Sequence, residues 1–382
     1  MDKSPPPNLS VAILATGDEI LQGDIVNLNA QTIAHLLFEQ GINSNTHMTV
    51  GDETSAIKAG IYYFLKQHKG LIITGGLGPT SDDLTRFALG EALKKPLILD
   101  EVTRKVIEQR LKKYGFTYLP KNNDQQALFP EGATIIPNPN GTAAGCYIEN
   151  EGTHIFMLPG PPAECIPMIT SFVIPILKKN HFQQNRYYKK WFLFGVSEGH
   201  IAEELESVVK DYNCTTGYRI FYPYVEFKIY STHLEDFNKL IPLIEEKIAS
   251  LIIGDGQHTA SDALKNILPK KAKKLHIKDL VSGGTLENIL KTPLTYPYLN
   301  FLDQSTDTAD ISITINGLTE YWQNIETSLT EFTLSITDNN NTQIFSKKIP
   351  LRGPRVKSYV AEFACQQALL VLIRNRNFFP HN

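Results

Sequence analysis

The chain lacks a strong charge of either sign and has no long apolar run. It carries 37 Lys and Arg against 40 Asp and Glu in 382 residues, a formal charge of -3. So balanced a charge disfavours wrapping of duplex nucleic acid through a basic face. The longest apolar runs fall far short of the roughly 20 residues of a membrane span. We therefore expect no nucleic-acid partner and no helix that crosses a bilayer, and the proline-rich start shows no secretion signal.

Cysteine is scarce, and several catalytic motifs are absent. The four cysteines form no close pair and no C-x-x-C; they are Cys146, Cys165, Cys214 and Cys365. Unpaired thiols of this kind are typical of a reduced, cytoplasmic protein without structural zinc. No H-x-x-x-H pair, G-x-S-x-G or Walker A lysine motif occurs, which argues against a zinc-protease helix, a serine-hydrolase elbow or a P-loop.

The N-terminal part alternates strands and helices. A β-rich apolar run, Val11 to Ala15, is followed by residues at helical spacing that stop at Gly41, and the alternation then repeats twice. Repeats of this length predict βαβ units, so we expect an α/β fold with a mostly parallel sheet covered on both faces. Turn-rich sequence with short strands follows from Asn122 to Pro162.

The chain length, at roughly 150 residues per domain, predicts two or three domains. A polar stretch at 179–185 marks the best boundary. Beyond it we expect a small α+β module in which 216–232 forms one strand. A third unit ends in a long helix from Val356 to Asn375. The predicted domains are 1–180, 181–257 and 258–382.

Glycine and hydroxyl residues dominate the segment from Thr74 to Arg86, directly after a predicted strand. Glycines let backbone amides approach a ligand closely, and Thr80 and Ser81 add hydroxyl groups. A helix N-terminus, expected at Asp82, carries about half a positive charge. The segment therefore favours phosphate binding.

Two consecutive carboxylates, Asp82 and Asp83, belong to the same segment. Alone they would repel a phosphate, so the combination predicts a divalent cation between the acids and the phosphate oxygens. The alternative is that both acids only occupy the first helical turn and complement the helix dipole.

Further polar residues follow the other predicted strands. Asp18, Glu19 and Asn27 come after the first strand and Asp52 after the second. Because ligands bind beyond the carboxyl ends of parallel strands, these residues and the glycine-rich segment are expected to share one crevice. Each group also has a purely structural interpretation. The residues after the first strand would form an acidic turn with an asparagine cap for the next helix, and residues 51–53 would form the N-cap region of the helix that follows them. The loop around Gly141 and Thr142 is suited to an uncharged base or ribose, or is simply a turn.

Together these motifs resemble the competence/damage-inducible CinA family. They are Gly17-Asp18-Glu19, Asn27-Leu28-Asn29, Gly51-Asp52, the Thr74 to Arg86 segment, Gln126-Ala127, Gly141-Thr142 and Leu158 to Glu164. The resemblance implies a three-layer α/β/α first domain of the MoaB/MogA type, a small KH-like α+β middle domain and a C-terminal α/β domain of the nicotinamide mononucleotide deamidase type. It also implies hydrolysis of ADP-ribose to AMP and ribose 5-phosphate by a cytoplasmic homodimer, with Co2+, Mg2+ or Mn2+ and stimulation by K+.

The resemblance also implies roles for individual residues. Asp82 and Asp83 would serve the metal, and either Asp83 or Asp52 would be the general base, with Asp18 and Glu19 as further catalytic candidates. The expected substrate contacts are Gly75, Gly76, Gly78, Thr80, Ser81, Asn27, Arg86, Gly141 and Thr142.

The chain departs from the family pattern in its third domain. Where the deamidase signature has a serine nucleophile, this chain has Leu280, so we expect that site to be lost unless Ser282 substitutes for it. The family commonly has proline where Ala144 stands. The alternatives are a molybdopterin-binding or adenylylating protein of cofactor synthesis, and a deamidase of nicotinamide mononucleotide. RNA binding by the middle domain is disfavoured, because residues 186–255 contain no G-x-x-G loop.

Overall fold

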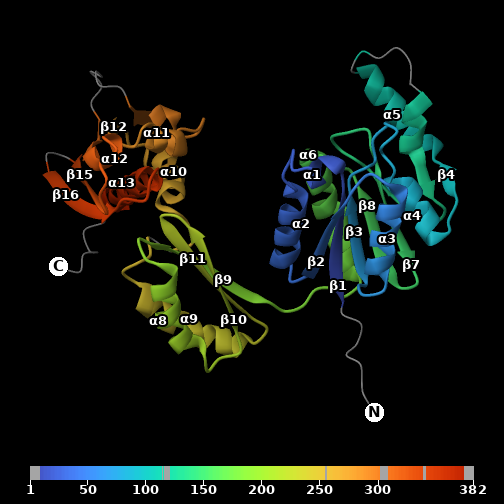
Figure 1. The fold of residues 1–382 in the computed structure, drawn as a ribbon, viewed down its shortest axis with the longest axis horizontal. Coiled ribbons are helices and arrows are strands. Elements are labelled where there is room, and N and C mark those ends of the chain that lie inside the picture. The colour runs from blue at the N-terminus through green and yellow to red at the C-terminus, as the bar shows by residue number, and fades with distance from the viewer. Residues whose placement is uncertain are drawn as a thin grey trace. The chain divides into compact units, whose positions relative to one another are not determined.

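A computed structural model of the chain describes residues 9–113, 115, 121–253, 256–301, 309–338 and 341–373. The chain divides into two compact units, Met1–Asn185 and Arg186–Asn382 (Figure 1). The division falls at the end of the polar stretch that the sequence marks as a boundary. The further division near residue 257 stays a prediction, and Asn375, the predicted end of the last helix, lies outside the described residues.

The first unit is built on a six-stranded sheet in the order β2-β1-β3-β8-β7-β6. Four neighbouring strands, β2, β1, β3 and β8, run parallel, whereas β7 and β6 pair antiparallel. The strands are β1 (Ser10–Thr16), β2 (Asn43–Val50), β3 (Gly70–Thr74), β6 (Thr134–Ile136), β7 (Gly145–Asn150) and β8 (Thr153–Leu158), with a separate pair β4 (Leu97–Leu99) and β5 (Leu128–Pro130). The mostly parallel sheet predicted from the sequence is confirmed.

Helices cover both faces of this sheet. Alternate residues of β1 enter two different cores: Leu14 packs with Ile61 of α3, and Ile13 packs with Ile33 of α2. Such a strand is buried on both sides, which explains its continuous apolar sequence. The three-layer α/β/α architecture is therefore confirmed. The helical segments are α1 (Asp18–Leu21), α2 (Leu28–Glu39), α3 (Thr54–Leu65), α4 (Thr85–Leu93), α5 (Glu101–Lys113), η1 (Lys121–Ala127), α6 (Pro162–Met168), η2 (Ile169–Val173) and α7 (Ile174–Lys179).

The second unit contains two sheets. The first is antiparallel, in the order β10-β11-β9, and the second is mixed, in the order β13-β12-β14-β15-β16. The first group of elements is β9 (Tyr187–Phe194), α8 (Glu198–Val209), β10 (Thr215–Phe221), β11 (Tyr224–Ser231) and α9 (Leu234–Ile248). The second is α10 (Ala260–Lys271), β12 (Leu275–Asp279), α11 (Thr285–Leu290), η3 (Tyr296–Tyr298), β13 (Leu299–Asn300), β14 (Ile311–Gly317), α12 (Thr319–Trp322), β15 (Leu329–Asp338), β16 (Asn341–Pro350) and α13 (Arg355–Ile373).

Two sequence predictions for this unit need correction. Residues 216–232 are not one strand but the hairpin β10–β11, which turns at Tyr222 and Pro223. The apolar pattern continues through the turn, and only the proline, which cannot donate to a ladder, signals the break. Helix α10 was not expected. Its signal is the N-cap Thr259, whose side chain accepts from the Asp262 N–H.

Helix α13 is long and apolar enough, by length and composition, to cross a membrane, which differs from the expectation that no helix of this chain would be. More than half of its apolar window is buried inside the protein. Val360, Ala364 and Ala368 lie in the core of the mixed sheet. Burial of this kind is typical of the core helix of a domain, so α13 is weak evidence for a membrane span.

Candidate functional site

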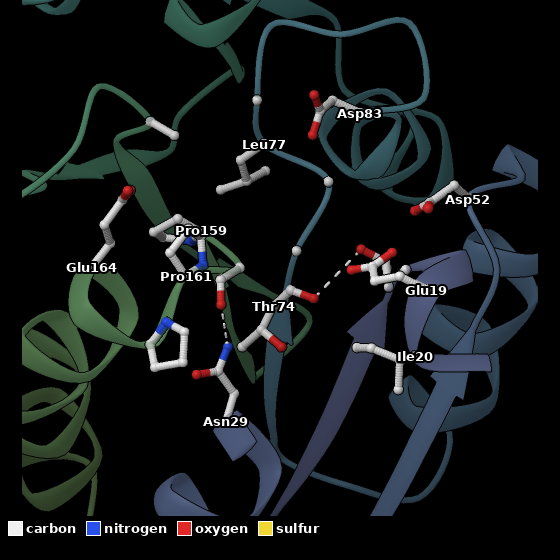
Figure 2. Close-up of a pocket in the computed structure, with 18 of the residues that line it drawn as sticks. Glu19, Ile20, Asn29, Asp52, Thr74, Leu77, Asp83, Pro159, Pro161 and Glu164 are labelled. Atoms are coloured by element: carbon white, nitrogen blue, oxygen red, sulfur yellow. Dashed lines mark hydrogen bonds between the residues drawn. The ribbon is translucent and has the colours of Figure 1, made fainter. Parts of the chain in front are cut away.

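One cavity of about 590 Å³ lies in the first unit. It is bordered by loops that follow β1, β2, β3 and β8, whose carboxyl ends meet because these strands are parallel (Figure 2). A volume of this size is within the range of small-molecule sites. The crevice that the sequence predicts at the strand ends is therefore present.

The glycine loop after β3 passes close to β1 and α4. Gly75 and Gly76 have φ values of 102° and 63°. A Cβ atom on Gly76 would collide with Thr85 Oγ1 and would lie 3.1 Å from Thr16 Oγ1. These two hydroxyl oxygens are 3.0 Å apart and share a hydrogen bond beneath the loop. The backbone at Gly76 thus has both a left-handed conformation and no room for a side chain.

The acids after the loop do not belong to the helix. Helix α4 begins at Thr85, three residues later than expected, and no acid stands in its first turn. Both the predicted start at Asp82 and the dipole alternative are therefore wrong. The Thr80 N–H donates to Asp83 Oδ2 at 2.9 Å, and the Thr80 hydroxyl donates to the same oxygen. These bonds close a turn that holds the acids ahead of the helix.

A second pair of acids connects the loops after β1 and β2. The Asp18 N–H donates to Asp52 Oδ2 at 3.0 Å, and the Asp52 N–H donates to Asp18 Oδ1 at 3.2 Å. Partial burial raises the pKa of Asp52; the Asp18 N–H opposes this, and the charges of Asp18, Glu19 and Asp82 raise the pKa further. Asp52 thus experiences the negative potential of three neighbouring carboxylates.

Carboxylates are the charged side chains of the cavity wall. Among the residues that the structure describes, five acids and neither Lys nor Arg line the cavity; the acids are Glu19, Asp52, Asp82, Asp83 and Glu164. Figure 2 shows Glu19, Asp52 and Asp83 on one side of the glycine loop and Glu164 on the other. The lining itself supplies no cationic side chain to neutralise a polyanion.

The wall on the Glu164 side is held by a network of hydrogen bonds. Asn138 Nδ2 donates to Glu164 Oε2 at 2.6 Å. Arg110 Nη2 donates to the carbonyl oxygens of Asn138 at 2.8 Å and Pro139 at 3.0 Å, and Arg110 Nη1 donates to that of Gly141. The loop that carries Thr142 is therefore fixed against the cavity.

Most of the residues predicted for the site line the cavity. These are Glu19, Asn27, Asp52, Gly75, Gly76, Gly78, Asp82, Asp83 and Thr142. Four others adjoin lining residues without lining the cavity themselves; they are Asp18, Thr80, Ser81 and Gly141. The shared crevice expected from the strand ends therefore brings these loops together.

Arg86 has a different position from the one expected of a substrate contact. It is fully buried, outside the cavity lining, and burial lowers its pKa to about 10. Its guanidinium donates to the carbonyl oxygens of Leu77 at 2.7 Å, Leu128 at 3.3 Å and Gln125. Arg86 therefore ties the glycine loop to segment 121–128, and its role as a substrate contact stays a prediction.

Several cavity residues were not predicted as site residues. Ile25, Val26 and Leu28 line it and are each more than half exposed. Three large apolar residues in an otherwise polar loop were the available sequence signal. Asn29 and Glu164 stand in the quoted motifs, but nothing in the sequence places both of them in one cavity.

Comparison with known proteins places the chain among its relatives. Residues 12–179 match a family model described as "Probable molybdopterin binding domain". The chain is 36% identical over 285 residues to a Caldicellulosiruptor saccharolyticus protein described by the words "competence-damage inducible protein", covering 72% of this chain and 68% of that relative. It is 30% identical over 286 residues to a CinA-like protein of Geobacter sulfurreducens, covering 73% and 69%.

The chain belongs to the CinA family. Among solved structures, that of "the protein CinA with unknown function" from Thermoplasma acidophilum is similar, with 29% identity and a TM-score of 0.42; the match covers 45% of this chain and 99% of that one.

The sequence resemblance aligns the nucleophile of the deamidase signature with residue 280, where this CinA-family chain offers no nucleophile. Leu280 stands there and is 55% exposed. Ser282 is fully buried, its hydroxyl donates to the Asp279 carboxylate, and its oxygen accepts from the Leu286 N–H at 3.0 Å. Ser282 therefore stabilises the start of α11 and is not accessible as a substitute nucleophile.

Carboxylate oxygens, which line the cavity, are the donor type that a hard divalent cation such as Mg²⁺ takes. Within the described parts of the chain, no group of three or more His, Cys, Asp or Glu side chains is arranged to hold a metal ion. Mg²⁺ usually binds through one or two carboxylates, with substrate phosphates and water completing its shell. Asp82 and Asp83 beside the glycine loop meet that requirement.

Proposed function

We propose that this CinA-family protein hydrolyses the diphosphate bond of ADP-ribose to AMP and ribose 5-phosphate with the help of a divalent cation. The observation that carries the proposal is the cavity wall, whose described residues combine a glycine loop with five carboxylates and include no basic side chain. A phosphate ligand would be repelled by such a wall unless a cation lay between them. Glycine-loop amides and cation together fit a diphosphate.

Each part of the wall has a distinct role in this proposal. Backbone amides at Gly76 to Gly78 would hold the diphosphate oxygens, because the Gly75 N–H already donates to the Leu158 carbonyl oxygen, and Asp82 and Asp83 would hold the cation. When bound, the cation neutralises phosphate charge and lowers the pKa of a coordinated water. The protein itself contributes mainly positioning and electrostatics, as is usual in phosphoryl transfer.

Asp52 is the better candidate for the general base. Asp83 Oδ2 already accepts two hydrogen bonds from Thr80, which hold that carboxylate in the turn. Asp52 accepts one, from the Asp18 N–H, and lines the cavity opposite the glycine loop. A carboxylate with free acceptor capacity in the cavity is able to orient or deprotonate the attacking water.

The test is product analysis with the purified chain. ADP-ribose is incubated with Mg²⁺, Co²⁺ or Mn²⁺, with and without K⁺, and AMP and ribose 5-phosphate are separated. Asp83→Ala and Asp52→Asn are expected to lower kcat/KM by at least about 100-fold with the fold intact. Asp24→Asn, an exposed acid outside the lining, is the matched control and should retain activity. Equal rates in all four proteins would refute the assignment.

A second candidate function is molybdopterin binding or adenylylation in cofactor synthesis. The observation that favours molybdopterin binding is the match of residues 12–179 to a family model described as "Probable molybdopterin binding domain". A pterin that copurifies with the protein, detected by its fluorescence, would support it, especially if ADP-ribose is not cleaved.

We also propose that the protein is a cytoplasmic homodimer. Light scattering of the purified chain measures its molecular mass and so tests the dimer.

A further inference from the structure

Asn29 has a buried polar atom without a partner. It stands in the first turn of α2, lines the cavity and is 7% exposed. Its Nδ2 donates to the Gly160 carbonyl oxygen at 2.6 Å (Figure 2). Its Oδ1 is buried and accepts no hydrogen bond from the part of the chain that the structure describes.

The orientation of this amide is fixed by its neighbour. If the amide were flipped, Asn29 Oδ1 would face the Gly160 carbonyl oxygen, and two acceptors would oppose each other. The orphan atom is therefore an acceptor. Leaving a buried polar group unpaired is unfavourable, and such a group in a native structure calls for an explanation. Here the atom belongs to a residue of the cavity wall, so a bound ligand is able to supply the missing donor.

The surroundings select the kind of donor. Asn29 lies at the positive end of α2, a helix of 12 residues whose start is capped by Asn27, which accepts from the Ala30 N–H at 3.0 Å. A hydroxyl group donates to Oδ1 and still presents a negative oxygen to the helix end. An amine has no such oxygen. Glu164, on the same side of the glycine loop, adds a second acceptor that suits hydroxyl groups and repels phosphates (Figure 2).

We propose that Asn29 Oδ1 accepts a hydrogen bond from a ribose hydroxyl of the substrate and makes Asn29 a specificity-determining residue. The sugar then lies on the Asn29 and Glu164 side of the glycine loop, and the diphosphate lies toward Asp52 and Asp83. This inference rests on the proposed function for the identity of the ligand. The hydroxyl belongs either to the adenosine ribose or to the terminal ribose.

Binding of the two products separates these sources. Calorimetry in Mg²⁺ compares AMP with 2′-deoxy-AMP and 3′-deoxy-AMP, and ribose 5-phosphate with 2-deoxyribose 5-phosphate. In the parent protein, loss of the recognised hydroxyl should weaken binding about tenfold. Asn29→Leu should bind the compound that carries the recognised hydroxyl, AMP or ribose 5-phosphate, about tenfold more weakly than the parent protein does. Its affinity for the matching deoxy compound should be no weaker than that.

Matched measurements make the test decisive. Asn180→Leu removes a comparable bond, from Asn180 Nδ2 to the Ile176 carbonyl oxygen at 2.9 Å, outside the cavity lining and should keep full discrimination. Melting curves of the variants check that each is folded. If the parent protein discriminates none of the deoxy compounds, or Asn29→Leu still discriminates every one that the parent does, the proposal is overturned. Because binding is measured without turnover, failure to cleave ADP-ribose would be a separate result.

Discussion

Replacing Gly76 by Ala tests whether the glycine loop holds its backbone conformation for the site. A residue with a Cβ loses about 1–2 kcal/mol in the left-handed region that Gly76 occupies. Its Cβ would also displace the Thr85 hydroxyl and break the bond with Thr16, worth about 0.5–1.5 kcal/mol. We expect a loss of about 2–3 kcal/mol in local stability. Cleavage of ADP-ribose should fall sharply, because the loop amides move away from the diphosphate.

Gly132→Ala is the matched control. Gly132 has a φ of 81°, but a Cβ there meets only Lys95 Nζ at 3.8 Å. It should therefore lose only the backbone contribution, about 1–2 kcal/mol, and keep its activity. Hydrogen exchange of peptides covering β3 measures local stability, with peptides of the second unit as internal reference. Equal exchange and equal activity of Gly76→Ala and Gly132→Ala would refute the claim that the loop has no room for a side chain.

Three further predictions concern buried polar groups. Arg86→Leu leaves buried carbonyl oxygens unpaired and should destabilise the first unit by at least about 1–3 kcal/mol, the cost of one such group, measured by hydrogen exchange. Burial lowers the pKa of His68 and of His154, so below about pH 6.5 the unfolded chain binds more protons than the folded one. The free energy of unfolding, measured by urea titration, should therefore decrease as the pH falls from about 7.5 to about 5.5. The decrease should be smaller in His154→Gln. Tyr224→Phe removes a hydroxyl that donates to Glu362 at 2.8 Å and should cost the second unit about 1–3 kcal/mol, measured by tryptophan fluorescence in urea.

The sheet and the position of the site follow from local sequence signals. The continuous apolar run of β1 requires burial on both faces, and strands that run parallel bring their carboxyl ends together. Asp52 and the glycine loop could therefore be placed in one crevice without knowledge of any contact. The start of α4 could not be predicted in this way. Acids near a helix start suggest that the helix begins at Asp82, but the bonds between Thr80 and Asp83 hold the acids in a turn ahead of it.

Residues whose roles depend on distant partners escaped prediction. Arg86 is a plausible phosphate ligand in sequence, but its position depends on the carbonyl oxygens of Gln125 and Leu128, some forty residues away. Asn29 is anchored by Gly160, 131 residues later in the chain. Tertiary packing of this kind leaves no periodic or capping signal near the residue itself, whereas the hairpin turn at Pro223 did leave one.

The central claim is that this acidic cavity accepts a diphosphate only together with a divalent cation. Its most direct test is a calorimetric titration of the purified chain with ADP-ribose in Mg²⁺ and in EDTA, under conditions too brief or too cold for cleavage. We predict binding in Mg²⁺ that is lost in EDTA and weakened by Asp82→Asn with Mg²⁺ present. Equal affinity for ADP-ribose with and without the cation would contradict the account.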